Sequence, residues 1–232
     1  MKYCLFAIAA LAAASAHAAS PPFPMRVGDV WTYDAEVEWV VKGTITTMRA
    51  KLPWTTKVVD AFEGPHGRAV VIQDFVFHLA WLDPAEPREP AFDVIVVRPD
   101  GLWIDTDVAS RADARIRARQ AAAGETVGSQ VLQFPLRENA CITSEDDPDR
   151  PRNGSYCWYL SLQDSSPKAR TWQLEYRSLP DHELLDFMEG VGFTEYTYGH
   201  HGTVAEAHAM LRGKPWRDEA HAAAKLSAPR TP

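Results

Sequence analysis

The sequence predicts a mainly β protein, built as a curved antiparallel sheet or half-barrel with one or two helices. Three observations support this class. Apolar and polar residues alternate with a period of two through most segments. Clusters of glycine and proline separate those segments, as turns separate paired strands. One long segment, residues 110–124, departs from the alternation and has the residues of a helix.

The first 18 residues have the three-part layout of a secretory signal. Lys2 precedes an apolar run at residues 4–14, and Ala16 and Ala18 place small side chains where a signal peptidase reads them. The run is shorter than the ~20 residues that span a bilayer, so we expect cleavage between Ala18 and Ala19. The mature chain is then expected to be periplasmic or secreted, without a transmembrane segment.

The remaining chain is expected to form one β-rich domain at residues 19–212, followed by a C-terminal tail at residues 213–232. The whole sequence has 24 basic and 31 acidic side chains, and its formal net charge is −7 at pH 7. An acidic chain without a basic stripe does not attract nucleic acid or an anionic membrane surface. We therefore expect no nucleic-acid partner.

Two cysteines, Cys141 and Cys157, remain once the signal and its Cys4 are removed. In an oxidising compartment they are expected to form a disulfide, with two free thiols as the alternative. A bridge over about 16 residues should stabilise the fold by roughly 3 kcal/mol. The segment between them, SEDDPDRPRNGS, is too polar to form a core of its own, so a disulfide that joins its two ends is expected.

The clearest strand of the N-terminal half covers residues 30–41. Its odd-numbered positions from Trp31 to Val41 are apolar and most even-numbered positions are polar, which predicts one buried face. A turn at 42–43 leads into the return strands. Residues 68–81 are predicted as a further strand that carries a row of apolar side chains on one face: Phe75, Phe77, Leu79 and Trp81.

The proline-rich stretch at residues 83–90 is predicted as an exposed loop. A hairpin follows, with its turn at Pro99-Asp100-Gly101. Three later segments also alternate: residues 126–136, 156–162 and 171–177. Together these segments predict a sheet of eight to eleven strands.

The predicted helix has recognisable ends. Ser110 is the expected N-cap, with Asp113 three positions later, and Gly124 is the expected stop. Ile116 and the alanines are expected to pack on the sheet.

The same helix places Arg111, Arg115 and Arg119 on one face. These guanidinium groups could hold an anion, but the Gly-rich or aromatic residues that accompany phosphate sites are missing. We therefore expect a solvated face.

Three histidines near the C-terminus, His200, His201 and His208, are the candidate metal ligands. Adjacent residues of a strand point to opposite faces, so His200 and His201 reach one ion only across an irregular turn. Glycines at both ends of GHHG favour a hairpin tip, with the start of a helix as the alternative. Because a zinc site needs three or four convergent ligands, we expect no metal and no cofactor.

The sequence contains no convergent catalytic set. It has no G-x-S-x-G elbow, and a disulfide between the mature cysteines excludes a Cys–His dyad. The aromatic residues predict either a filled core or, on the concave side of a curved sheet, an aromatic-lined pocket.

The leading hypothesis is therefore a non-enzymatic exported protein that binds an apolar or amphipathic ligand or an envelope protein. The alternative is a metal-assisted hydrolase that uses His200, His201 and His208 with Glu195 or Glu206.

Two stretches resemble known sequences. FPMRVGDVWTYD is similar to the VGDxWxY start of many exported bacterial proteins and lipoproteins, and FMEGVGFTEYTYGHHGT resembles the GVGxxxYxY closing strands of the same uncharacterised envelope proteins. The resemblance implies a periplasmic or secreted location, a curved sheet comparable to the lipoprotein-carrier half-barrel, and no established activity. The chain lacks the acylated cysteine of the lipoprotein members.

Overall fold

The computed structural model describes Phe23 and residues 25–142, 156–166, 169–202, 204–213 and 216–217. It confirms a mainly β fold with one antiparallel sheet and one α-helix. The elements in chain order are β1 (Asp29–Val40), β2 (Thr47–Gly64), β3 (Gly67–Gln73), the 3-10 helix η1 (Val76–Leu79), β4 (Phe92–Arg98), β5 (Gly101–Val108), α1 (Arg111–Ala123), β6 (Ser129–Gln133), β7 (Cys141–Ile142), β8 (Trp158–Ser166), β9 (Ala169–Arg177), β10 (Asp181–Met188), β11 (Gly192–His200), β12 (Ala205–Leu211) and β13 (Trp216–Arg217).

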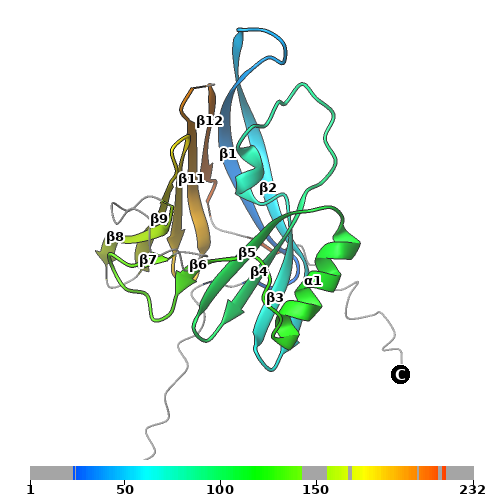
Figure 1. Ribbon diagram of the computed structural model, residues 1–232, viewed down its shortest axis with the longest axis vertical. Helices are drawn as coiled ribbons and strands as arrows, with labels where there is room; N and C mark the ends of the chain where they lie inside the picture. The colour runs from blue at the N-terminus through cyan, green and yellow to red at the C-terminus, as the bar shows by residue number, and fades with distance from the viewer. Residues whose placement is uncertain are drawn as a thin grey trace, which may run out of the picture.

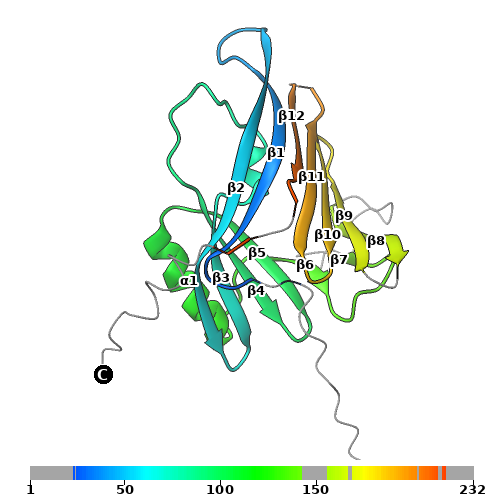
Figure 2. The ribbon, with the colours of Figure 1, turned by 180° about the vertical axis from the view of Figure 1, so that it is seen from behind.

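The described strands form a single 13-stranded sheet. Hydrogen-bonded neighbours follow the order β6-β5-β4-β3-β2-β1-β12-β11-β10-β9-β8-β7, and β13 pairs with β1. The end strands β6 and β7 lie close to each other, so the sheet curls into a nearly closed half-barrel, as Figures 1 and 2 show. The sequence predicted fewer strands because β7 and β13 have two residues each, too few for a period-two pattern.

β1 confirms the predicted two-faced strand. Trp31, Tyr33 and Val37 are at most 3% exposed, and they alternate with polar residues on the outer face. Tyr33 pairs with Trp54 of β2 and with Leu211 of β12. Because side chains in register point to the same face, the concave side of the sheet presents continuous apolar rows.

Residues 74–91 form a loop, which we call the filling loop, whose first part around η1 is buried on the concave side while residues 84–90 are exposed. Its ends are joined, because the Asp74 N–H donates to the Ala91 carbonyl at 3.0 Å and the Ala91 N–H donates to Asp74 Oδ1 at 3.0 Å. The predicted strand over residues 68–81 is therefore wrong in its second half. β3 ends at Gln73, Asp74 has a φ of 54°, and η1 follows.

Burial explains why this segment leaves the sheet. Phe75, Val76 and Leu79 are at most 1% exposed, because the half-barrel surrounds them with apolar side chains. Alternating apolar residues cannot by themselves distinguish a strand from a short buried turn. The polar residue of η1 is paired, since His78 Nε2 lies 3.0 and 2.9 Å from the two carboxylate oxygens of the fully buried Asp93.

β12 provides the space for the filling loop. Its inward residues, Ala205, Ala207 and Ala209, are at most 2% exposed, and the strand lies against η1. Larger side chains at these positions would overlap the loop, because interiors are close-packed. The alanines also gave this segment a helical propensity, but it pairs with β11 and completes the predicted hairpin, so the helical alternative is excluded.

α1 lies on the outer face of β2–β5 (Figure 1). The predicted caps are confirmed: Ser110 Oγ accepts from the Asp113 N–H at 3.1 Å, and Gly124 ends the helix with a φ of 110°. The expectation for Ile116 is wrong, because this residue is 53% exposed. It lies about 200° around the helix from Ala114. The alanines alone face a second core formed by valines of the sheet: Ala114, Ala118, Ala121 and Ala122.

The predicted arginine face also differs from the expectation. Arg111 Nε donates to Asp60 Oδ2 at 2.9 Å, and Arg115 Nε lies 3.5 Å from Asp60 Oδ1. The Arg119 guanidinium lies 5.1 Å from the centre of the Phe62 ring. Asp60 is 0% exposed, so these arginines are not merely solvated but compensate a buried carboxylate.

Cys141 and Cys157 form the predicted disulfide, with Cα atoms 5.5 Å apart. It joins β7 to the residue before β8. By closing a 16-residue separation, the bridge should stabilise the fold by roughly 3 kcal/mol through the lower entropy of the unfolded chain.

The predicted signal at residues 1–18, its cleavage point between Ala18 and Ala19, and residues 218–232 of the predicted tail lie outside the described residues. Two tail residues, Trp216 and Arg217, pair with Val30 and Asp29 as β13. Within the described residues, no helix has the length and apolar character needed to cross a membrane.

Candidate binding site at the mouth of the half-barrel

The β1–β2 and β11–β12 hairpins both turn at one end of the half-barrel. We call this end the mouth. On the concave side near it, one row of paired residues contains Trp158, Tyr176, Glu183 and Tyr198. Asp181 pairs with His200 in the row closer to the hairpin turns. With neighbours from the filling loop and β11, these residues form the acid–aromatic cluster: Phe77, Trp81, Trp158, Tyr176, Asp181, Glu183, Tyr196, Tyr198 and His200.

Asp181 is the anchored carboxylate of the cluster. Its Oδ1 accepts from the Tyr198 hydroxyl at 2.7 Å and lies 2.8 Å from His200 Nδ1. Burial opposes ionisation, but hydrogen bonds from His200, Tyr198 and Ser178 outweigh it and lower the pKa of Asp181. Asp181 is therefore an anion at neutral pH.

Glu183 has the opposite environment. Burial raises the pKa of this carboxyl to about 7, and repulsion from Asp181 adds to the shift. Within the described residues it has no hydrogen bond and no salt bridge. Near neutral pH, Glu183 is consequently divided between its protonated and its charged form.

Tyr196 brings a second unsatisfied group to the same place. Its side chain is 0% exposed, and its hydroxyl has no hydrogen-bond partner among the described residues. Burial raises its pKa, and Glu183, Tyr198 and Asp181 add to the effect electrostatically. The negative charges of both carboxylates therefore act on this hydroxyl.

Aromatic rings frame these polar groups. Phe77 stacks on Trp158 with ring centres 6.0 Å apart and contacts Tyr196 at 5.4 Å, and Trp158 contacts Tyr176 at 5.2 Å. Phe77, Trp158 and Tyr176 are only partly buried. The concave face is therefore filled by fully buried aliphatic and aromatic side chains at depth and lined by partly exposed rings near the mouth.

Trp81 covers the other side of the cluster. Its ring centre lies 4.6 Å from that of His200 and 6.0 Å from that of Tyr198, yet the residue is 54% exposed. Its φ of 63° is unusual for a bulky side chain. Residues held in such conformations concentrate at binding sites, where surrounding contacts maintain them.

Other large apolar side chains are exposed at this end of the half-barrel. Ile45 at the β1–β2 tip is 98% exposed, Leu179 before β10 is 83% exposed, and Val204 before β12 is 37% exposed. Met48 of β2 is 47% exposed.

Replacing Glu183 by glutamine should change how stability depends on pH. The folded-state pKa of about 7 lies above the ordinary 4.5, so the stabilisation is complete below about pH 4.5 and is lost as pH rises through 7. At about 1.4 kcal/mol per pKa unit, the wild type should lose about 3 kcal/mol between pH 4 and 8 relative to Glu183→Gln. Urea unfolding of both proteins across this range measures the difference, and parallel curves would contradict a protonated Glu183.

The structure does not bring the three candidate metal ligands together. His200 faces the mouth beside Asp181, whereas His208 lies on the outer face with Nε2 2.7 Å from Glu195 Oε1. His201 is exposed in the turn, where its backbone N–H donates to the Pro180 carbonyl at 2.6 Å. In the part of the chain that the structure describes, no three His, Cys, Asp or Glu side chains are grouped to hold a metal ion.

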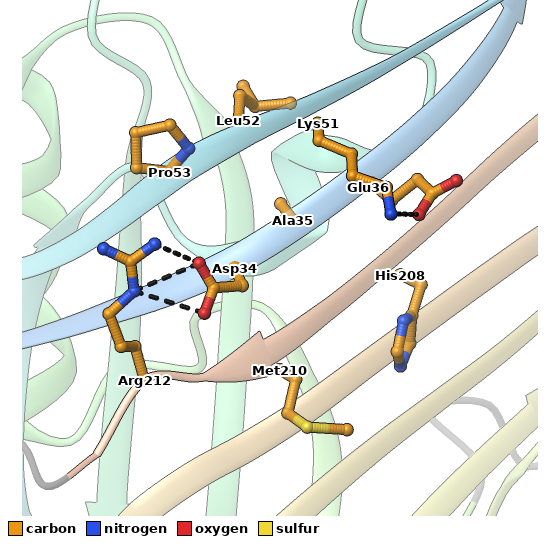
Figure 3. A pocket seen from close by; sticks show the side chains of 9 residues that line it. All are labelled: Asp34, Ala35, Glu36, Lys51, Leu52, Pro53, His208, Met210 and Arg212. Atoms are coloured by element: carbon orange, nitrogen blue, oxygen red, sulfur yellow. Dashed lines mark hydrogen bonds and ion pairs between the residues drawn. The ribbon is translucent and has the colours of Figure 1, made fainter.

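A depression of about 450 Å³ lies outside the half-barrel, over β1, β2 and β12 (Figure 3). Its charged residues already have opposite partners. Arg212 Nε donates to Asp34 Oδ1 at 3.0 Å, and Lys51 Nζ lies 3.2 Å from Glu36 Oε2. Because these charges are compensated within the protein, we favour the acid–aromatic cluster as the functional site.

The sequence reasoning missed Asp181 and Glu183. The pattern that could have identified them lies in DHELLDF. Residues 181 and 183 occupy the same alternate positions as the inward-facing Leu185 and Phe187. An acid at an inward position of a strand must be buried or face a recess. The aromatic residues were recognised only as a core or a pocket lining.

No protein family matches the chain, and no curated protein matches its sequence. Among solved structures, a candidate exported protein with a YmcC-like fold from Bacteroides fragilis is 10% identical, with 84% of this chain and 98% of that chain covered and a TM-score of 0.37. A candidate lipoprotein from Parabacteroides distasonis has the same identity and coverage, with a TM-score of 0.34. Similarity this low carries no argument about activity.

Proposed function

We propose that this chain is an exported, non-catalytic binding protein that takes a partly apolar ligand at the acid–aromatic cluster. The signal layout of residues 1–18 supports export. The disulfide between Cys141 and Cys157 is of the kind that persists in oxidising compartments.

One observation carries the binding proposal: partly exposed aromatic rings surround a carboxyl group that has no partner among the described residues. Small-molecule sites typically combine apolar and aromatic walls with a few polar groups that orient the ligand. Here Phe77, Trp158 and Tyr176 supply the walls, and Glu183 is the polar group. Covering the exposed ring area would favour binding by about 25 cal/mol per Å².

Uptake of the neutral apolar dye N-phenylnaphthylamine by the mature protein tests this proposal. We expect saturable binding of one dye per chain. Trp81→Ala should weaken it about tenfold, which corresponds to about 1.4 kcal/mol. Trp81 is suited to this test because it is half exposed and its loss should leave the core intact.

Met210→Ala is the matched control, since Met210 is 52% exposed but lies in the outer depression. This variant should bind the dye like the wild type. Absence of saturable uptake, or equal weakening by both substitutions, would overturn the proposal.

A further inference from the structure

We propose, on the basis of the proposed function, that the ligand is an apolar molecule with a protonated amine, for which Glu183 and Asp181 provide the counter-charge. The argument rests on the charge of the site, an unsatisfied hydroxyl, and the surrounding rings.

The charge of the acid–aromatic cluster is negative. Asp181 and Glu183 face the same side of β10, and the basic group that contacts them in the described structure is His200, on Asp181 Oδ1. Arg177, the nearest arginine along the chain, pairs with Glu175 instead. A ligand with a positive charge would therefore supply what Glu183 lacks.

The Tyr196 hydroxyl is a second polar group at the site that a ligand could pair with, and its oxygen can accept a hydrogen bond from an ammonium. It is fully buried, has no partner among the described residues, and lies in the field of Glu183 and Asp181. Buried polar groups in proteins are nearly always paired. A primary ammonium has three N–H donors, enough to reach both a carboxylate and this hydroxyl oxygen.

The rings of the cluster suit the same ligand. Tyr176 and Tyr198 flank Glu183 in register, and Trp81 lies over Tyr198. The faces of tryptophan and tyrosine attract cations, while their hydrocarbon surface accepts an alkyl chain.

Binding should be linked to proton release. The titratable groups that face Glu183 are Asp181 on its own strand, Tyr176 on β9, and Tyr196, Tyr198 and His200 on β11. From the filling loop, the uncharged Phe77 and Trp81 contact the cluster, and the titratable His78 beside Phe77 is paired with Asp93. An incoming ammonium favours the charged form of Glu183, so affinity should rise with pH until Glu183 is already ionised, by at most about tenfold per pH unit.

The test compares three probes with the same alkyl chain and different charge: octylammonium, octanol and octanoate. Isothermal titration with the mature protein at pH 8 should give affinities that fall in that order, with octylammonium at least about tenfold tighter than octanol. From pH 8 to pH 5, octylammonium binding should weaken while octanol binding stays constant.

Glu183→Gln should remove the preference for octylammonium and its pH dependence, but retain octanol binding. Glu175→Gln is the matched control, because Glu175 pairs with His182 and Arg177 rather than with the cluster. Equal affinity for the three probes would overturn this inference and leave the proposed function standing. No binding of any probe would overturn both. Persistent pH dependence in Glu183→Gln would place its origin at another group and refute the role of Glu183.

Discussion

Replacing Phe75 by alanine is expected to lower the free energy of unfolding by about 4 kcal/mol. Phe75 is 0% exposed, and its ring lies edge-on to Phe77 at 4.8 Å and to Phe193 at 5.1 Å. The substitution would leave a cavity where the filling loop joins the sheet. The sheet cannot collapse into it, because both neighbouring rings are held by their own contacts.

Chemical denaturation of wild type and Phe75→Ala measures this loss. Glu86→Ala is the control, because Glu86 is exposed in the same loop and its replacement should change stability by less than about 0.5 kcal/mol. A loss below about 1 kcal/mol for Phe75→Ala would show that the filling loop is not part of the core.

Replacing both Arg111 and Arg115 by alanine should lower the free energy of unfolding by a similar amount, about 4 kcal/mol, because it removes these two counter-charges from a buried carboxylate. Asp60 is 0% exposed, and Arg111 also donates to the neighbouring Val59 carbonyl at 3.0 Å. The two arginines therefore both fix α1 on the sheet and make the burial of Asp60 tolerable. Thermal or urea unfolding of the double alanine variant measures the effect.

Arg117→Ala is the control on the same helix. Arg117 pairs with Asp105 at 2.7 Å, but its side chain is 48% exposed. Its loss should cost no more than about 1 kcal/mol, as for other surface pairs. Adding Asp60→Asn to the double variant should recover part of the stability, because it removes the buried charge. If the double variant were no less stable than Arg117→Ala, Asp60 would not depend on these arginines.

The acid–aromatic cluster shows why the site could be predicted only in part. Aromatic residues at alternate positions indicated either a filled core or a pocket lining. In the structure Trp158 and Tyr176 are only partly buried, so they belong wholly to neither. Glu183 had to be found by its position in the register rather than by any motif. The row that joins it to Tyr176 and Tyr198 crosses three strands, and strand pairing is a long-range property that no local pattern encodes.

The histidines show the same limit. The GHHG sequence indicated a turn, because glycine at both ends of a short polar segment suits a hairpin tip, and β11 and β12 pair accordingly. The face of the sheet to which each histidine side chain points was set by the strand pairing. His200 points to the mouth and His208 to the outer surface, so their roles depend on partners from other strands, Asp181 and Glu195.

By itself, the sequence determined the local structure: the two-faced strands, the capped helix between Ser110 and Gly124, and the pair Cys141–Cys157. These features depend on side-chain period, capping groups and chain chemistry, which act over a few residues or through a covalent bond. The tertiary structure decided the conformation of residues 74–81, which had a strand pattern but leave the sheet and bury Phe75, Val76 and Leu79 inside the half-barrel. It also decided the full burial of Asp60 and the partial burial of Glu183, because burial depends on which distant side chains surround a residue.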